Sequence, residues 1–256
     1  MKKNTKILYF IFFVSILILI FSLYYINIET FKNNETNFDN TGMYVLYIPK
    51  REKYIKNVMN KLKLNPEFVK GFDKNNLDLN KLIKNNKVLK QFAKEDNIGR
   101  IACNLGHINI LNKFLKSDNK FALILEDDIA VDKYDETTSK IINLTNNIPP
   151  DAEIVYFGYC TESCSVAKKY NELFFHSVNP NCRHCYLVTK LGAKKIIDNI
   201  YPINMNGDQY MRTLISSKKI KAYNANYEYF TIKQNRDEMG SELNNNQTLR
   251  ECKEMK

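Results

Sequence analysis

The sequence of 256 residues contains no tryptophan and only 8 glycines. Glycine this scarce excludes a collagen-like repeat, which needs glycine at every third position. Hydrophobic residues make up 44% and aromatic residues 12% of the chain, as in ordinary folded proteins, so a wholly disordered chain is excluded as well. The length suits one domain of moderate size with appendages.

The chain also lacks the signatures of nucleic-acid binding. Its net charge is +10, but the lysines are scattered among asparagine and glutamate, and no zinc-finger, helix-turn-helix or RNP pattern occurs. Three of the positive charges, Lys2, Lys3 and Lys6, precede the first acidic residue of the chain. We therefore expect a solvated basic surface and no nucleic-acid partner; such a surface would also attract a small polyanionic substrate.

Charge is absent from the stretch Ile7 to Ile28. At about 1.5 Å per residue this apolar run is long enough to cross a bilayer of roughly 30 Å. Basic residues precede the run and none follows immediately, which favours a cytoplasmic amino terminus. Because no small-x-small cleavage site follows, an uncleaved anchor is favoured over a cleaved signal peptide. The sequence thus predicts a single-pass type II membrane protein facing the lumen of the endoplasmic reticulum or Golgi, or host secretory membranes if the protein is viral.

The anchor sets the domain organisation. The chain is divided into a cytoplasmic tip and transmembrane signal anchor (1–28), a flexible polar stem (29–42), a globular domain (43–235) and a polar tail (236–256). N-x-T sequons beyond the anchor, at Asn34, Asn143 and Asn246, are compatible with a glycoprotein.

Strands and helices are predicted to alternate along the globular domain. Strands are expected at Met43–Ile48, Phe68–Asp73, Phe121–Leu125, Asp151–Gly158, Leu173–Val178, Tyr186–Thr189 and Ile220–Phe230. Helices are expected at Ile55–Leu62, Ile98–Lys116, Asp135–Asn146, Lys190–Ile200 and Asn206–Ser216, with a weak helix or variable surface segment at Asn75–Lys94. This order predicts an α/β fold with a mostly parallel sheet and right-handed crossovers.

Three consecutive carboxylates, Glu126, Asp127 and Asp128, follow directly on the apolar run Phe121–Leu125. An unbroken apolar run is typical of a strand buried on both faces, so the acids lie at its carboxyl end. Open α/β sheets bind ligands at that edge, where carboxylates suit a divalent cation. The alternative is a strand that ends in solvent with an aspartate beginning a turn.

Basic residues follow the first predicted strand, and a single histidine lies in the long helix. Lys50 and Arg51 come directly after Pro49, where a first βα turn would bring them to a ligand; exposed loop positions are the alternative.

His107 lies beside the apolar face of its helix, and a hydrogen-bonded structural role is favoured over an active-site role.

Two cysteine pairs allow two interpretations. Cys160 with Cys164 and Cys182 with Cys185 have the spacing of a four-thiolate zinc site, and His184 adds a spare ligand. An oxidising lumen favours disulfides instead, within or between the pairs, with a connectivity that the sequence leaves open. Cys103, on the apolar helix, is expected to be a small buried hydrophobe.

The stretch GRIACNLGHINILNKFLKSDNKFALILEDDIAVD, Gly99 to Asp132, resembles the core signature of glycosyltransferase family 25. That signature runs from a Gly-x-Ile-x-Cys helix with Leu-Ser-His into Leu-Glu-Asp-Asp. Weaker similarities are found at Met43–Lys53, at Cys182–Ile197, and at Asp208, Gln234 and Ser241, where the family has an Asp and a Gln-x-Ser tail. The family includes lipooligosaccharide galactosyltransferases and collagen hydroxylysine galactosyltransferases.

The resemblance implies a GT-A fold, in which a nucleotide-sugar-binding sheet is flanked by helices. It implies transfer of galactose or glucose from UDP-galactose or UDP-glucose to a hydroxyl group of a protein or glycan acceptor. It also implies Mn²⁺ or Mg²⁺, which would neutralise charge on the departing UDP. The expected metal ligands are Glu126, Asp128 and Asp208, the expected donor-binding residues Lys50, Arg51, His107, Glu126 and Asp127, and the expected catalytic residues Asp208 and Asp128. Because alternate strand residues point to opposite faces, Asp128 and only one of Glu126 and Asp127 are expected to reach the metal or ribose.

Two alternatives stay open at this stage. Asp208 is expected to be a metal ligand or the general base for the acceptor, but an acid in the first turn of a helix is also stabilised by the helix dipole alone. The alternative to an enzyme is a noncatalytic luminal binding module that retains the fold around a cysteine-rich zinc or disulfide loop. Carboxylates at Glu126–Asp128 and at Asp208 argue against that module, which has no physical need for them.

Overall fold

The structure is a computed structural model that describes residues 14–22, 36–163, 165–226, 229 and 232–235. Of the predicted anchor, only residues 14–22 are described, and they are helical; its remainder, the first part of the predicted stem and the predicted tail fall outside the described residues. Within the described ranges, the structure contains no helix with the length and apolar character needed to cross a membrane.

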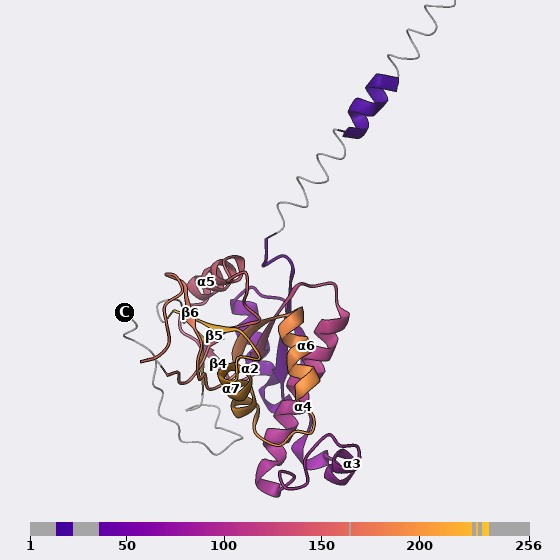
Figure 1. Ribbon diagram of the computed structural model, residues 1–256, viewed down its shortest axis with the longest axis vertical. Helices are drawn as coiled ribbons and strands as arrows, with labels where there is room; N and C mark the ends of the chain where they lie inside the picture. The colour runs from indigo at the N-terminus through magenta and orange to yellow at the C-terminus, as the bar shows by residue number, and fades with distance from the viewer. Residues whose placement is uncertain (1–13, 23–35, 164, 227–228, 230–231, 236–256) are drawn as a thin grey trace, which may run out of the picture.

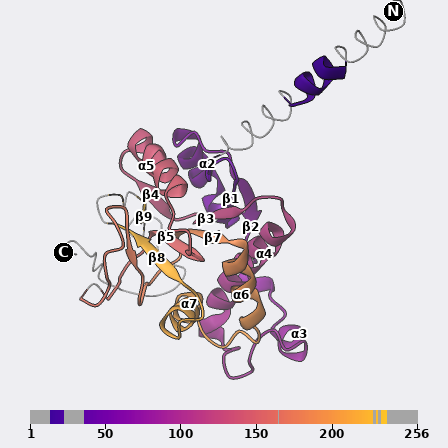
Figure 2. The same cartoon turned by 45° about the horizontal axis from the view of Figure 1, so that its top comes forward.

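A seven-stranded mixed sheet forms the centre of the globule, in the order β2-β1-β3-β7-β5-β8-β6 (Figure 2). Its strands are β1 (Thr41–Tyr47), β2 (Glu67–Lys70), β3 (Phe121–Glu126), β5 (Ile154–Gly158), β6 (Phe174–His176), β7 (Cys185–Thr189) and β8 (Ala222–Ala225). A separate two-stranded sheet pairs β4 (Ile129–Val131) with β9 (Ile232–Gln234). All seven predicted strands are confirmed; β1, β3 and β7 are slightly longer than predicted and the other four are shorter.

Helices cover both faces of the large sheet. They are α2 (Glu52–Lys61), α3 (Leu79–Lys84), α4 (Ile98–Lys116), α5 (Tyr134–Asn146), α6 (Lys190–Asn199) and α7 (Gly207–Ser216), with short 3-10 turns η1 (Pro49–Arg51), η2 (Lys74–Asn76) and η3 (Glu95–Asn97). In Figure 2, α2 and α5 lie on one side of the strands and α4, α6 and α7 on the other. The small α3 has no buried residue and lies at the edge of the globule (Figure 1).

The central strand β3 shows why this layering follows from the sequence. Ala122 and Ile124 belong to the core on the α4 side, whereas Leu123 and Leu125 belong to the core on the α2 and α5 side, and all four are fully buried. Side chains that alternate between two apolar layers need the unbroken apolar run from which this strand was predicted.

The expectation of a mostly parallel sheet is correct for five strands, β2, β1, β3, β5 and β8, which run in one direction, whereas β7 and β6 run in the opposite direction. β1 is parallel to β2 and β3, but β7 lies between β3 and β5 and is antiparallel to both. Parallel pairing needs a crossover that returns the chain to the starting edge. The described residues between β5 and β7 contain the short strand β6 but no helix, and β7 starts where β5 ends. As a result, Cys185 at the start of β7 pairs with Leu125 at the end of β3.

The last residues of the predicted stem belong to the globule. The amide of Phe38 donates to Asn146 Oδ1 at 2.9 Å, the Phe38 side chain packs against the core, and β1 begins at Thr41.

One buried carboxylate organises the irregular segment between β5 and β7. Glu162 accepts hydrogen bonds at 2.6 Å from the amides of Ser163 and Asn179, at 2.8 Å from the Ser177 hydroxyl and at 2.7 Å from Asn224 Nδ2. These partners come from the segment itself and from β8, so Glu162 joins the segment to the sheet.

We expect Glu162→Gln to lower the melting temperature of the protein by roughly 5–10 °C. The amide nitrogen of the new glutamine would face other hydrogen-bond donors, which costs about 2–3 kcal/mol of stability when the groups are buried. For a protein of this size, each kcal/mol of lost stability lowers the melting temperature by about 2–4 °C. Thermal unfolding measures the shift, and Glu172→Gln is the matched control because that side chain is 85% exposed. Equal shifts in the two variants would rule out the organising role of Glu162.

Candidate active site

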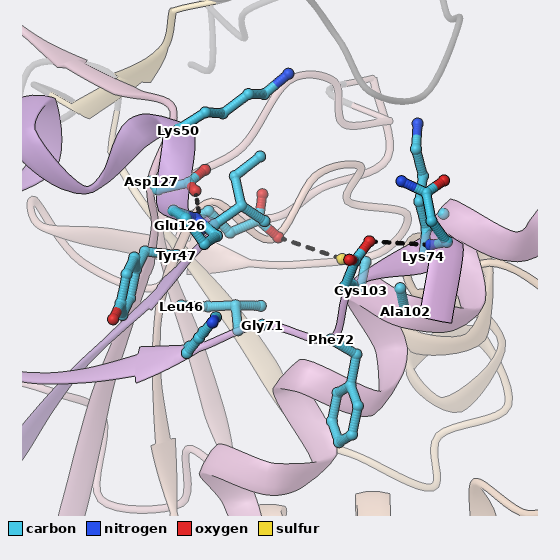
Figure 3. Close-up of a pocket in the computed structure, with 16 residues that line it drawn as sticks. Leu46, Tyr47, Lys50, Gly71, Phe72, Lys74, Ala102, Cys103, Glu126 and Asp127 are labelled. Carbon is cyan, nitrogen blue, oxygen red and sulfur yellow. Dashed lines mark hydrogen bonds between the residues drawn. The ribbon is translucent and has the colours of Figure 1, made fainter. Parts of the chain in front are cut away.

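A cavity of about 700 Å³ opens where β1 and β3 end (Figure 3). Its walls come from the β1–η1 turn, the loop after β2, the first turns of α4 and the end of β3. Glu126 and Asp127 lie in the wall, as do the lysines Lys50, Lys70 and Lys74. The cavity is therefore acidic at the end of β3 and basic along its rim, at the sheet edge where the sequence predicted a ligand.

Both carboxylate oxygens of Asp127 accept hydrogen bonds. Arg51 Nη1 donates to Oδ1 at 2.9 Å, and the amide of Ile48 donates to Oδ2 at 2.7 Å. Arg51 is buried, whereas its neighbour Lys50 is exposed at the cavity. The two basic residues predicted as a ligand-binding pair thus have different environments: Arg51 holds the ends of β1 and β3 together, and Lys50 faces the cavity.

Asp128 has one oxygen occupied and one without a hydrogen-bond partner. Its Oδ2 accepts from Gln234 Nε2 at 2.9 Å and lies 3.6 Å from Arg51 Nη1. Its Oδ1 is buried and, within the described part of the chain, receives no hydrogen bond. Burial and then the charge of Glu126 raise the pKa of Asp128 to about 7. A buried carboxylate oxygen without a donor has the chemistry of a cation ligand.

Gln234 lies against the cysteine segment. Cys160 and Cys182 form a disulfide, and their sulfurs lie 3.6 and 3.7 Å from Gln234 Oε1. The amide nitrogen on the other side of the group donates to Asp128. The sequence marked Gln234 only through a family resemblance, because its separation of 106 residues from Asp128 hides the contact.

Glu126 is bound by a buried histidine. His107 Nε2 lies 2.8 Å from Glu126 Oε1, and His107 Nδ1 lies 3.0 Å from the Tyr186 hydroxyl. Burial lowers the pKa of His107, so the ring is neutral, and burial raises the pKa of Glu126 to about 7. When Glu126 is ionised, Nε2–H donates to it and Tyr186 donates to Nδ1. His107 therefore orients a carboxylate, which agrees with the structural role favoured from the sequence, and it is not among the residues that line the cavity.

Asp208 lies in the first turn of α7 and pairs with a buried arginine that sequence reasoning missed. Arg183 Nε is 3.4 Å from Asp208 Oδ1, and Arg183 Nη2 donates to Asn104 Oδ1 at 3.0 Å. The available signal was a charged residue flanked by cysteines just before an apolar strand. Asp208 does not line the cavity described above.

Two sets of three potential metal ligands converge within 4.8 Å among the described residues. They are Cys160, Cys182 and His184, and Cys103, His107 and Glu126. In the first set the sulfurs are bonded to each other, so the disulfide interpretation, between the pairs, is confirmed for Cys160 and Cys182 and the four-thiolate zinc interpretation is wrong. Cys164 falls outside the described residues, and Cys185 is a buried free thiol.

The expected hard-cation set stays a prediction. Glu126, Asp128 and Asp208 do not form one of the convergent groups found in the described ranges. The surroundings nevertheless fit a divalent cation, because Asp128 Oδ1 is a buried acceptor that receives no hydrogen bond from the described residues, and the neighbouring acids Glu126 and Asp127 line the cavity.

Cys103 is not the buried hydrophobe that was expected. It lies half-buried in the cavity wall, with its sulfur 4.0 Å from Glu126 Oε1. Burial raises the pKa of its thiol to about 12, so the thiol is protonated when no cation is bound.

We expect the acid pair Glu126 and Asp128 to make the metal-free protein more stable at about pH 6 than at about pH 8. Their folded-state pKa values of about 7 exceed the value of roughly 4 for unfolded carboxyl groups. The folded state therefore holds more protons across this window, and the stability that they contribute is lost as the pH rises through 7.

Melting temperatures in EDTA at the two pH values measure this effect. Between the lower and the higher pH, the parent should lose more stability than a Glu126→Gln, Asp128→Asn double variant. The expected difference is roughly 1–2 kcal/mol in stability, or about 3–6 °C in melting temperature. Other titrating groups are shared by both proteins and cancel. Identical pH dependence would show that the two acids titrate normally.

Comparisons with known proteins locate the site within a family. The profile described as "Glycosyltransferase family 25 (LPS biosynthesis protein)" matches residues 46–211, more than half of the chain and nearly all of the site. Curated proteins gave no match. Among solved structures, A197 from STIV is similar with 10% identity and a TM-score of 0.38, over 72% of this chain and 81% of that one. A glycosyltransferase involved in the glycosylation of the major capsid of PBCV-1 is similar with 10% identity and a TM-score of 0.32, over 68% and 66%.

Proposed function

The chain belongs to glycosyltransferase family 25 and is a glycosyltransferase, and we propose that it transfers galactose or glucose from a UDP-sugar to a hydroxyl group of a protein or glycan, in a GT-A-type site assisted by Mn²⁺ or Mg²⁺. The observation that carries this proposal is the cavity at the joined ends of β1 and β3, with Glu126 and Asp127 in its wall and the buried Asp128 Oδ1, which receives no hydrogen bond from the described residues, directly after them in the chain. A cation held by these acids would neutralise charge on the departing diphosphate.

The donor is proposed to occupy the cavity with its diphosphate toward the acids. Lys50, Lys70 and Lys74 place positive charge around the opening, which attracts a polyanionic nucleotide sugar and orients its phosphates. Asp127 contributes by holding Arg51 and the end of β1 in place, so the floor of the cavity is rigid. His107 holds the Glu126 carboxylate in one orientation.

Asp208 is proposed to take the proton from the acceptor hydroxyl. Its side chain is 36% exposed, so an acceptor approaching from solvent reaches it, and Arg183 fixes its position at the start of α7. A carboxylate that removes the proton while the sugar is transferred makes the hydroxyl oxygen a better nucleophile.

The full chain in detergent, incubated with a panel of UDP-sugars, tests the proposal. We expect UDP release with UDP-galactose or UDP-glucose, loss of release in EDTA and recovery on adding Mn²⁺. Absence of release from every UDP-sugar with either Mn²⁺ or Mg²⁺ would contradict the donor assignment, and release that EDTA leaves unchanged would contradict the metal.

The globule is further proposed to be anchored in a secretory membrane and to face the lumen. The uncharged run Ile7–Ile28 supports the anchor, and the Cys160–Cys182 disulfide supports an oxidising compartment. Protease added to sealed microsomes should remove an epitope tag placed before Met1 and spare a tag placed after Lys256. The opposite pattern would contradict this topology.

A further inference from the structure

We propose that Cys103, His107 and Glu126 form a binding site for Zn²⁺ in the wall of the cavity. One potential ligand atom of each, a sulfur, an imidazole nitrogen and a carboxylate oxygen, lies within 4.8 Å of the other two. This donor set differs from the all-oxygen set proposed for Mn²⁺, because thiolate and imidazole prefer Zn²⁺ over the harder cations. Glu126 is the one residue that the two sites share.

The three donors are carried by rigid elements in a favourable arrangement. Cys103 and His107 are four residues apart on α4, so they project from the same face one turn apart, as paired ligands on zinc-binding helices do. Glu126 comes from the end of β3. Helix α4 is fixed against β1 at Gly106, where an added Cβ would lie only 2.7 Å from Leu46 Cδ1.

The two distances from Glu126 need only small adjustments to bind the ion. Glu126 Oε1 lies 2.8 Å from His107 Nε2 and 4.0 Å from Cys103 Sγ. Tetrahedral zinc with ordinary bond lengths places such ligand atoms about 3.4–3.6 Å apart. Moving the Glu126 carboxylate from the imidazole toward the thiol corrects both distances, and rotation of the Cys103 side chain sets the third, for which the ligand atoms lie within 4.8 Å of each other.

The surroundings also supply the groups that zinc sites use around the ligands. When Nε2 of His107 binds zinc, Nδ1 carries the proton and donates it to the Tyr186 oxygen, 3.0 Å away. Arg183 Nη2 lies 3.8 Å from Cys103 Sγ and favours the thiolate that zinc requires. Binding releases the thiol proton to solvent, and the thiolate and carboxylate together neutralise the ion.

Access is provided by the cavity, since Cys103 and Glu126 both line it. Three protein ligands leave the fourth position of the zinc open, as in zinc sites that bind water or a substrate group. Because Glu126 is shared, Zn²⁺ competes with the cation of the transfer reaction and inhibits it. This second part of the inference rests on the proposed function, whereas binding itself does not.

Cobalt(II) serves as a spectroscopic probe for zinc. Added to the full chain with its Cys160–Cys182 disulfide oxidised, Co²⁺ should give a sulfur-to-cobalt charge-transfer band that stoichiometric Zn²⁺ removes. The band should be absent from Cys103→Ser and retained in Cys185→Ser, the control that changes the other free cysteine of the described chain, buried on β7. Melting temperatures equal to the parent's establish that both variants are folded.

A band that persists in folded Cys103→Ser, or no band in the parent, would overturn the site. Inhibition is measured separately as the Zn²⁺ concentration that halves Mn²⁺-supported UDP release, relative to the zinc-free rate of each variant. We expect this concentration to rise about tenfold or more in Cys103→Ser, because loss even of a residue that only supports a metal ligand costs about 10–100-fold in metal affinity. If the protein releases no UDP at all, the cobalt band still decides whether the site exists.

Discussion

Asp128→Asn is expected to reduce UDP release by about 100-fold or more, since loss of residues that merely support a metal ligand already costs about 10–100-fold. The buried Oδ1 of Asp128 is an acceptor that the described residues leave without a hydrogen bond, and it is the expected ligand of the proposed cation. An amide at this position has no negative charge, and its nitrogen turned toward a cation would repel it. Steady-state assays with saturating UDP-sugar and increasing Mn²⁺ measure the loss.

The same substitution should leave the metal-free protein equally stable or more stable. The amide oxygen of asparagine can still accept from Gln234 Nε2, while the cost of burying a second charge beside Glu126 disappears. At about pH 8 we expect a melting temperature in EDTA unchanged or raised by roughly 2–4 °C, corresponding to about 1 kcal/mol. Large loss of activity without loss of stability is the result that separates a ligand from a residue that holds the fold.

Asp132→Asn provides the matched control. Asp132 follows β4 in the same acidic stretch, but its side chain is 75% exposed. It forms a surface ion pair with Lys233, at a distance of 3.2 Å. Activity and melting temperature should both stay within error of the parent. If Asp128→Asn lost stability in step with activity, the acid would serve the fold, and the proposed metal role would fail.

The sequence was most informative where local pattern decides the structure. The apolar run of β3 and the helical spacing of α4 predicted both elements, α4 with the observed bounds, because burial on both faces and one broad apolar face leave periodic signals. The position of the acids at the end of β3 followed from the same reasoning. These predictions needed no contact between distant residues.

The direction of β7 and the partners of the acids could not be predicted in this way. A strand that returns without a helix has the same apolar pattern in either direction, so nothing in Cys185–Thr189 indicates its antiparallel pairing with β3. Asp128 and Gln234 are 106 residues apart, and the disulfide that contacts Gln234 joins positions 22 residues apart. Such contacts depend on how the segment between β5 and β7 folds, which short-range patterns do not encode.

The adjacent residues Lys50 and Arg51 give the clearest case. In sequence they are an equivalent basic pair, but the 3-10 turn η1 directs Arg51 into the interior and leaves Lys50 at the cavity. What separates them is the pairing of Arg51 with Asp127, 76 residues away. The structure therefore predicts that substitution by alanine lowers stability at Arg51 and weakens donor binding at Lys50.

Arg51→Ala is expected to destabilise the protein by about 3–5 kcal/mol, because removing one partner of a buried ion pair leaves an uncompensated buried charge. Arg51 is 7% exposed and lies 2.9 Å from Asp127 Oδ1 and 3.6 Å from Asp128 Oδ2, so its loss affects two carboxylates at once. In thermal unfolding this corresponds to roughly 10 °C or more. Lys50→Ala should change the melting temperature by no more than about 1 °C, because an exposed charge contributes little to stability.

Adding Asp127→Asn to Arg51→Ala distinguishes the buried-charge explanation from simple loss of packing. If the penalty comes from the unpaired charge, the second substitution should recover a substantial part of the lost stability, with a coupling of about 1–3 kcal/mol in the double-mutant cycle. Additive losses would instead attribute the effect to the missing arginine stem.

Lys50→Ala should raise the KM for the UDP-sugar about fivefold with little change in kcat, since a rim charge near the cavity contributes up to about 1 kcal/mol to binding an anion. A stability loss in Lys50→Ala equal to that of Arg51→Ala would show that the two residues act as one basic pair after all.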